Sequence, residues 1–248
     1  MAGAALRRRL TWLLAEAVEL IEETPEVRTI GLSVPGWPGH LAGQHVDLRL
    51  TAEDGYQAQR SYSIATPPRG EELALTVERV PDGEVSGYML DELRVGDQFE
   101  LRGPIGGYFV WTPDLSGPLA LLGAGSGIVP LIAMLRERAR SGGATPASLL
   151  LSSRSWDRVI YRAELERLGE DDVRVVHTLT RAQPAGWTGY ARRVDREMLE
   201  EGVPPASAEP RCYVCGPTGF VEAAASGLVE LGHHPSRVKT ERFGPTGD

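Results

Sequence analysis

The chain is expected to fold as two domains, an N-terminal antiparallel β-barrel followed by a C-terminal α/β domain built on a parallel sheet. Its 248 residues suit two compact domains of ordinary size. Short strand-like runs separated by Gly and Pro turns fill the first half, whereas apolar strands alternate with amphipathic helices in the second. We place the linker at 113–118, so the predicted domains are residues 1–113, which would bind a flavin, and 114–248, which would bind a nucleotide.

The first half contains six strand-like runs and one short helix. Turn residues such as Pro35-Gly36 and Pro67-Pro68 separate the runs at the spacing typical of an all-β barrel or sandwich. The helix is expected at 85–93. The predicted strands are 13–21, 27–34, 45–50, 60–65, 73–79 and 99–102.

The segment Arg60-Ser61-Tyr62-Ser63 could bind a phosphorylated cofactor. Arg60 and Tyr62 share one face of a strand, so the guanidinium could neutralise a phosphate while the ring packs on a ribose or a flavin edge. The alternative is an exposed arginine on an edge strand. The turn Gly83-Glu84-Val85-Ser86 favours binding, because it opens the predicted helix with a second cluster of free amides. A guanidinium and a cluster of free amides would together suit the two phosphates of a pyrophosphate.

The second half begins with an apolar strand at 119–122 that runs into Gly123-Ala124-Gly125-Ser126-Gly127 and a helix at 128–140. Glycines let the backbone turn tightly, and the first amides of the helix favour a phosphate. A purely structural turn is the alternative. Further strands at 148–151, 173–179 and 212–215 alternate with helices, which implies right-handed crossovers and a parallel sheet.

Composition excludes several functional classes. A net charge of −8 argues against a general nucleic-acid binder, and no apolar run reaches the ~20 residues of a membrane span. Cys212 and Cys215 are too few for a disulfide framework or a four-cysteine metal site, and the five histidines show no ligand spacing. We therefore assign no metal, and any electron carrier is expected to be an organic cofactor or another protein.

The N-terminus carries Arg7-Arg8-Arg9 before an apolar stretch, which imitates an export signal. Glu16 and Glu19 interrupt that stretch before it is long enough. We expect a cytoplasmic protein, with a twin-arginine signal as the alternative.

Five segments in this order give the chain a family resemblance. With them, residues 12–244 resemble ferredoxin–NADP reductase-type flavoproteins, especially the reductase components of bacterial oxygenase systems. The segments are Arg60-Ser61-Tyr62-Ser63, Gly83 to Ser86, Gly103-Pro104-Ile105-Gly106-Gly107-Tyr108-Phe109, 123–130 and Tyr213-Val214-Cys215-Gly216-Pro217.

The resemblance implies a bound FAD and a role for each matching residue. Arg60 would hold the pyrophosphate, Tyr62 would pack against the isoalloxazine or ribityl region, and Ser63 would hydrogen-bond near flavin N5. The glycines 123, 125 and 127 would line the pyrophosphate of the nicotinamide dinucleotide. The implied cofactor-binding set is Arg60, Ser61, Tyr62, Ser63, Gly83, Val85, Ser86, Gly123, Gly125, Ser126, Gly127, Arg154, Thr180, Arg181, Cys215, Gly216, Pro217 and Phe243, and the implied catalytic residues are Ser63, Cys215 and Phe243.

Two of these positions depart from the family or have an ordinary alternative. Ser126 stands where the family often has Thr, and either residue offers a hydroxyl. Phe243 resembles the aromatic that covers the flavin, but a core aromatic near the chain end is the alternative, and the chain continues past it to Asp248. The expected flavin is FAD, with FMN as the alternative, because the choice depends on whether the first domain has room for an adenosine.

Two strand ends bear on the choice of nicotinamide. An acid near the ribose 2′-hydroxyl suits NAD, whereas an arginine accommodates the 2′-phosphate of NADP. Ser153-Arg154 and Thr180-Arg181 each combine a hydroxyl with a cation, which favours NADPH. Asp157 argues the other way, and NADH remains open.

The implied reaction is hydride transfer from nicotinamide to flavin, with the protein supplying positioning and electrostatics. No ferredoxin domain follows residues 241–244, so electrons are expected to pass to a separate ferredoxin, oxygenase component or other one-electron protein. A free-standing flavin or quinone reductase is one alternative, and a non-catalytic dinucleotide-binding subunit is another.

Overall fold

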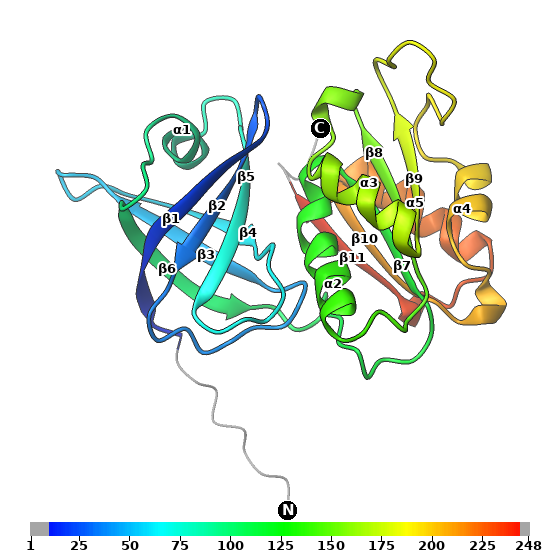
Figure 1. Cartoon of the computed structure of the whole chain (residues 1–248), viewed down its shortest axis with the longest axis horizontal. Coiled ribbons are helices and arrows are strands. Elements are labelled where there is room, and N and C mark those ends of the chain that lie inside the picture. Colours follow the sequence, from blue (N-terminus) through cyan, green and yellow to red (C-terminus); the bar gives the residue numbers. More distant parts are fainter. Residues whose placement is uncertain (1–9, 244–248) are drawn as a thin grey trace, which may run out of the picture.

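The computed structural model describes residues 10–243 and shows two bodies side by side, one built of antiparallel strands and one of parallel strands with helices (Figure 1). This confirms the predicted fold class. The arginine run at 7–9 and the tail at 244–248 lie outside the described residues.

The first body is a six-stranded antiparallel sheet in the order β4-β3-β6-β1-β2-β5. Alternate residues point inward, so that Ile30, Leu48, Leu75 and Leu101 fill its interior with no exposed surface. Helix α1 lies against β4 and β5. The elements are β1 (Trp12–Thr24), β2 (Val27–Ser33), β3 (His45–Thr51), β4 (Gln57–Ser63), β5 (Glu72–Glu78), α1 (Glu84–Asp91) and β6 (Gln98–Ile105).

The second body is a five-stranded parallel sheet in the order β11-β10-β7-β8-β9. Both faces are covered, because Leu119 and Leu121 of β7 pack with α2 and α3, while Ala120 and Leu122 pack with α4 and α5. This explains its nearly continuous apolar strands. The elements are β7 (Leu119–Ala124), α2 (Ile128–Arg140), β8 (Ala147–Ser153), α3 (Arg162–Asp171), β9 (Val173–Leu179), α4 (Arg196–Gly202), β10 (Arg211–Pro217), α5 (Thr218–Glu230) and β11 (Val238–Phe243), with single 3-10 turns at Gly125–Gly127, Trp156–Arg158, Ala206–Ala208 and Pro235–Arg237.

Two sequence expectations need correction. Strand β4 covers 57–63 rather than 60–65, because Gln57, Ala58 and Gln59 also pair with β3, whereas Ile64 forms an isolated bridge to Leu75 of β5. Strand β11 was not predicted, since three of its six residues are charged (Lys239, Glu241 and Arg242). It pairs in parallel with β10 at the edge of the sheet.

The two bodies share a hydrophobic core and several hydrogen bonds. Ala65 and Trp111, which lie outside the parallel sheet, are buried with the apolar residues of α2 in one cluster. Arg136 of α2 donates to the carbonyl oxygen of Ala65 at 2.8 Å, and the hydroxyls of Thr76 and Tyr161 are hydrogen-bonded across the boundary. The predicted domain boundary at residue 113 falls between β6 and β7. None of the helices between residues 10 and 243 has the length and apolar character that crossing a bilayer requires.

Candidate functional site

The parallel sheet has a topological switch point between β7 and β10. From β7 the chain proceeds through β8 and β9 on one side, and β10 with β11 lies on the other. Crossovers that leave a sheet in opposite directions open a crevice at the carboxyl ends of the two central strands, where ligands of open α/β sheets bind. The Gly-rich turn after β7 and the segment 215–217 at the end of β10 meet at this point, with Cys215 opposite Gly123.

The structure requires glycine at the three positions of the turn for different reasons. Gly125 has φ +54°, which favours glycine. Gly127 has ordinary helical angles, but a Cβ there would lie 2.2 Å from the carbonyl oxygen of Cys215, so the turn packs directly on β10. Gly123 is buried in β7, where a Cβ would lie 3.0 Å from Leu131. Close packing accounts for positions 123 and 127, and the backbone at Gly125 and Ser126 is the half-exposed part of the turn.

The strand ends beside the turn combine a thiol, a carboxyl and an aromatic ring. Cys215 is fully buried, and burial, with a contribution from Glu241, raises the pKa of its thiol well above the ordinary value, so the thiol stays neutral. In β11, Glu241 is in register with Cys215, and Phe243 is in register with Pro217 and packs against the shared core.

Glu241 is a candidate site residue that the sequence pattern does not indicate. Burial raises the pKa of its carboxyl to about 7, and its Oε2 is buried without a hydrogen-bond partner among residues 10–243. A charged residue within the stretch Lys239 to Arg242 gives the pattern of a solvated strand or loop. Only the pairing of β11 with β10 places this carboxyl beside Cys215.

In the barrel, Arg60 and Tyr62 of β4 lie on the same face, opposite the buried residues Leu48 and Val46 of β3. Arg60 is exposed and makes no ion pair within the described part of the chain; its Nη1 donates to the carbonyl oxygen of Gln59. Burial raises the pKa of Tyr62 to about 12, and its ring packs against the barrel core. The guanidinium is therefore available to an anion, as the motif predicts.

Ser61 and Ser63 point to the other face of β4. The hydroxyl of Ser61 donates to Asp47 at 2.7 Å, and Asp47 pairs with Arg102 at 2.6 Å, so this hydroxyl is already used within the barrel. By contrast, the Oγ of Ser63 is buried and has no partner among residues 10–243. A buried hydroxyl without a partner costs about 1–3 kcal/mol, a cost that a ligand atom or a water at this place would remove. A polar edge of a flavin ring would satisfy it, and the residues present therefore fit this cofactor.

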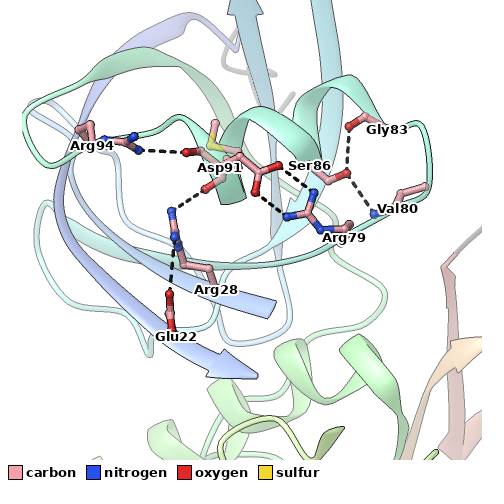
Figure 2. Close-up of polar contacts among 9 residues, drawn as sticks. Glu22, Arg28, Arg79, Val80, Gly83, Ser86, Asp91 and Arg94 are labelled. Atoms are coloured by element: carbon pink, nitrogen blue, oxygen red, sulfur yellow. Dashed lines mark hydrogen bonds and ion pairs between the residues drawn. The ribbon is translucent and has the colours of Figure 1, made fainter. Parts of the chain in front are cut away.

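The turn before α1 is closed by the side chain of Ser86, as Figure 2 shows. Its Oγ accepts from the N–H of Val80 at 3.1 Å and donates to the carbonyl of Gly83 at 3.2 Å. A Cβ on Gly83 would lie 2.6 Å from that Oγ, so only glycine fits. Arg79 pairs with Asp91 at 2.7 Å and holds the helix to β5 (Figure 2). The amides of Val85 and Ser86, in the first turn of α1, keep the free N–H groups of a helix start.

The ends of β8 and β9, which are predicted to contact the ribose of the nucleotide, lie side by side. The N–H of Thr180 donates to Ser153 and the N–H of Arg181 to Arg154, both at 2.9 Å. Both arginine side chains are exposed. A hydrogen bond from Ser155 lowers the pKa of Asp157, the residue that argued for NAD. Elsewhere in residues 10–243, no cluster of His, Cys, Asp and Glu has the arrangement of a metal site.

Comparison with known proteins matches both halves of the chain to family models. Residues 21–110 match the oxidoreductase FAD-binding domain, and residues 121–226 match the oxidoreductase NAD-binding domain. NADH-cytochrome b5 reductase 1 of Emericella nidulans is 32% identical over 79% of this chain and 65% of its own length. The reductase subunit of glycine betaine monooxygenase of Pseudomonas aeruginosa is 31% identical over 94% of this chain and 64% of its own length.

Among solved structures, a cytochrome P450 reductase of Amycolatopsis superposes with a TM-score of 0.82 at 27% identity, covering 95% of this chain and 71% of that one. The chain thus spans slightly less than two thirds of the two curated relatives and somewhat more of this structure.

Proposed function

This chain belongs to the ferredoxin reductase family of FAD- and NAD-binding oxidoreductases, and we propose that it is a reductase that takes a hydride from NADPH or NADH and delivers electrons to a separate protein. The observation that carries the proposal is the pair of complementary half-sites. Within residues 10–243, strand β4 carries a buried hydroxyl without a hydrogen-bond partner (Ser63) and a guanidinium without an ion pair (Arg60), and a Gly-rich turn lies at the switch point of the parallel sheet.

A flavin bound in the barrel would supply the chemistry, accepting two electrons as a hydride and releasing them singly. Arg60 and the amides of Val85 and Ser86 would neutralise its pyrophosphate. Ser63 would donate or accept one hydrogen bond at the ring. Tyr62, whose ring packs against the barrel core, would pack beside it as a neutral phenol.

On the nucleotide side, the amides of Gly125 and Ser126 would hold the dinucleotide pyrophosphate, with Cys215 and Gly216 as a wall beside the nicotinamide. The neutral Cys215 would act by packing, because a hydride transfer needs no thiolate. Phe243, at the end of β11, would cover the reaction site until the nicotinamide displaces it. Excluding water from this crevice strengthens each electrostatic contact within it.

For the nucleotide we propose a preference for NADPH. Arg154 and Arg181 lie on adjacent strand ends joined by a backbone hydrogen bond, and two exposed cations at this place would suit a 2′-phosphate. Replacing both arginines with Ala should raise the KM for NADPH at least tenfold and change the KM for NADH by less than threefold. Equal effects on both nucleotides would remove the basis for this preference. The relative in Emericella nidulans, which is named an NADH-cytochrome b5 reductase, is evidence against it.

For the acceptor we propose a one-electron protein, either a ferredoxin or an oxygenase component. Support comes from the named relatives, which include a monooxygenase reductase subunit and a cytochrome P450 reductase. The test is to purify the protein, identify any flavin released on denaturation, and measure reduction of a ferredoxin, cytochrome b5, free flavin and a quinone under the same NADPH supply. Saturable reduction of the ferredoxin alone would support the proposal. Faster reduction of free flavin or quinone would favour a free-standing reductase, and a colourless protein that turns over neither nucleotide would contradict a catalytic role.

A further inference from the structure

A carboxylate from the barrel meets the amide of Ser126 in the Gly-rich turn. Glu78 is the last residue of β5, and its Oε2 accepts a hydrogen bond from the N–H of Ser126 at 3.3 Å. The same oxygen lies 3.7 Å from the position that a Cβ on Gly125 would take. An anion belonging to the chain therefore stands against the half-exposed side of the turn.

Glu78 is not held there by an ion pair of its own. Its neighbour Arg79 pairs with Asp91 on the other side of β5, and Glu78 makes no ion pair within 4 Å among residues 10–243. The pKa of nearby Arg158 is raised chiefly by its hydrogen bond with Glu26, with Glu78 contributing only through its charge. The main partner of the Glu78 carboxylate is thus the turn amide, which attracts anions in general.

We propose that Glu78 is an internal competitor for the phosphates of the nicotinamide dinucleotide and so sets the affinity of this site, a proposal that rests on the function proposed above. A carboxylate and a phosphate cannot accept the same N–H of Ser126, and two negative charges a few ångströms apart repel each other. The dinucleotide must displace the carboxylate, which weakens binding and speeds the release of the oxidised product. Because the pyrophosphate is common to NADH and NADPH, Glu78 affects both equally, unlike Arg154 and Arg181.

The test compares Glu78→Gln with the matched control Glu72→Gln, which removes the same charge from the exposed opposite end of β5. The Kd values of NAD⁺ and NADP⁺ are measured by calorimetric titration of the flavin-loaded protein at low and high salt. We expect Glu78→Gln to bind both nucleotides about tenfold more tightly, a change of ~1.4 kcal/mol, because the substitution removes the negative charge that repels the phosphates and leaves a weaker acceptor for the amide of Ser126. Glu78→Lys should bind more tightly still, the gains should shrink at high salt, and Glu72→Gln should match the wild type.

The sign of the effect separates competition from a structural role, because loss of a merely structural contact between the bodies would weaken binding. Unchanged or weaker affinity in Glu78→Gln, with the flavin spectrum and melting temperature of the wild type, would overturn the inference while leaving the proposed function intact. If Glu78→Gln does not fold, an affinity in Glu78→Lys no higher than in the wild type overturns it in the same way. A wild type that binds neither nucleotide would overturn both.

Discussion

Replacing Gly127 with Ala tests whether the Gly-rich turn needs its close contact with β10. The residue has ordinary helical angles, φ −59° and ψ −13°, so the methyl group introduces no backbone strain by itself. Its Cβ, however, would lie 2.2 Å from the carbonyl oxygen of Cys215 and 2.8 Å from the N of Gly216. Both are backbone atoms of a central strand, so the turn must move by about 1 Å to restore normal contact distances.

Overpacking of this kind costs about 1–3 kcal/mol, and at ~3 °C per kcal/mol the melting temperature should fall by about 3–9 °C. A turn displaced by about 1 Å should also lose at least tenfold in nucleotide affinity, whereas flavin retention in the barrel should not change. The measurements are thermal unfolding, flavin content and titration with NADP⁺.

The control is Gly169→Ala in the exposed part of α3, where the nearest atom to a Cβ is 3.9 Å away. That change should stabilise the protein by about 0.5–1 kcal/mol, because alanine is the better helix former. If Gly127→Ala unfolds within 1 °C (roughly the 0.3 kcal/mol level) of the wild type and binds NADP⁺ normally, the close-contact explanation is wrong.

Three buried polar groups carry further consequences. The pKa of Glu241 is raised by burial from 4.5 to about 7, so its neutral form stabilises the fold, and this stability is lost as the pH rises from about 4.5 to 7. Urea unfolding at pH 5 and pH 8 should show the wild type losing up to about 3 kcal/mol more than Glu241→Gln, and parallel losses would contradict this. Tyr161→Phe removes the hydroxyl bound to Thr76 and should lower the free energy of unfolding by about 1 kcal/mol without changing flavin content; an unchanged midpoint would show that this bond contributes nothing. Ser86→Ala opens the turn before α1 and should speed flavin loss on dilution, so a flavin dissociation rate equal to that of the wild type would refute its supporting role.

Much of the fold could be predicted because apolar residues are spaced differently in the two halves of the sequence. The apolar run of β7 indicates a strand covered on both sides, and the alternating β2 and β5 indicate a barrel wall with one buried face. The turns at 83–86 and 123–127 could be predicted as candidate sites because glycines directly before a helix start form a local sequence pattern.

The remainder depends on contacts between distant segments. Glu241 becomes a buried carboxyl only because β11 pairs with β10, and Glu78 meets Ser126 only because the barrel packs on the parallel sheet. A charged residue in either position gives a local pattern that fits solvent exposure. Sequence periodicity reports on one element at a time, so it could not identify these two groups.

The core that runs continuously from Ala65 and Trp111 into α2 limits how the two halves of this protein can be separated or exchanged. Cutting the chain between its two sheets would expose apolar surface on each fragment. We therefore expect neither fragment to fold stably by itself. Exchanging the nucleotide-binding half with that of a relative would also require new apolar residues at the interface between the two halves.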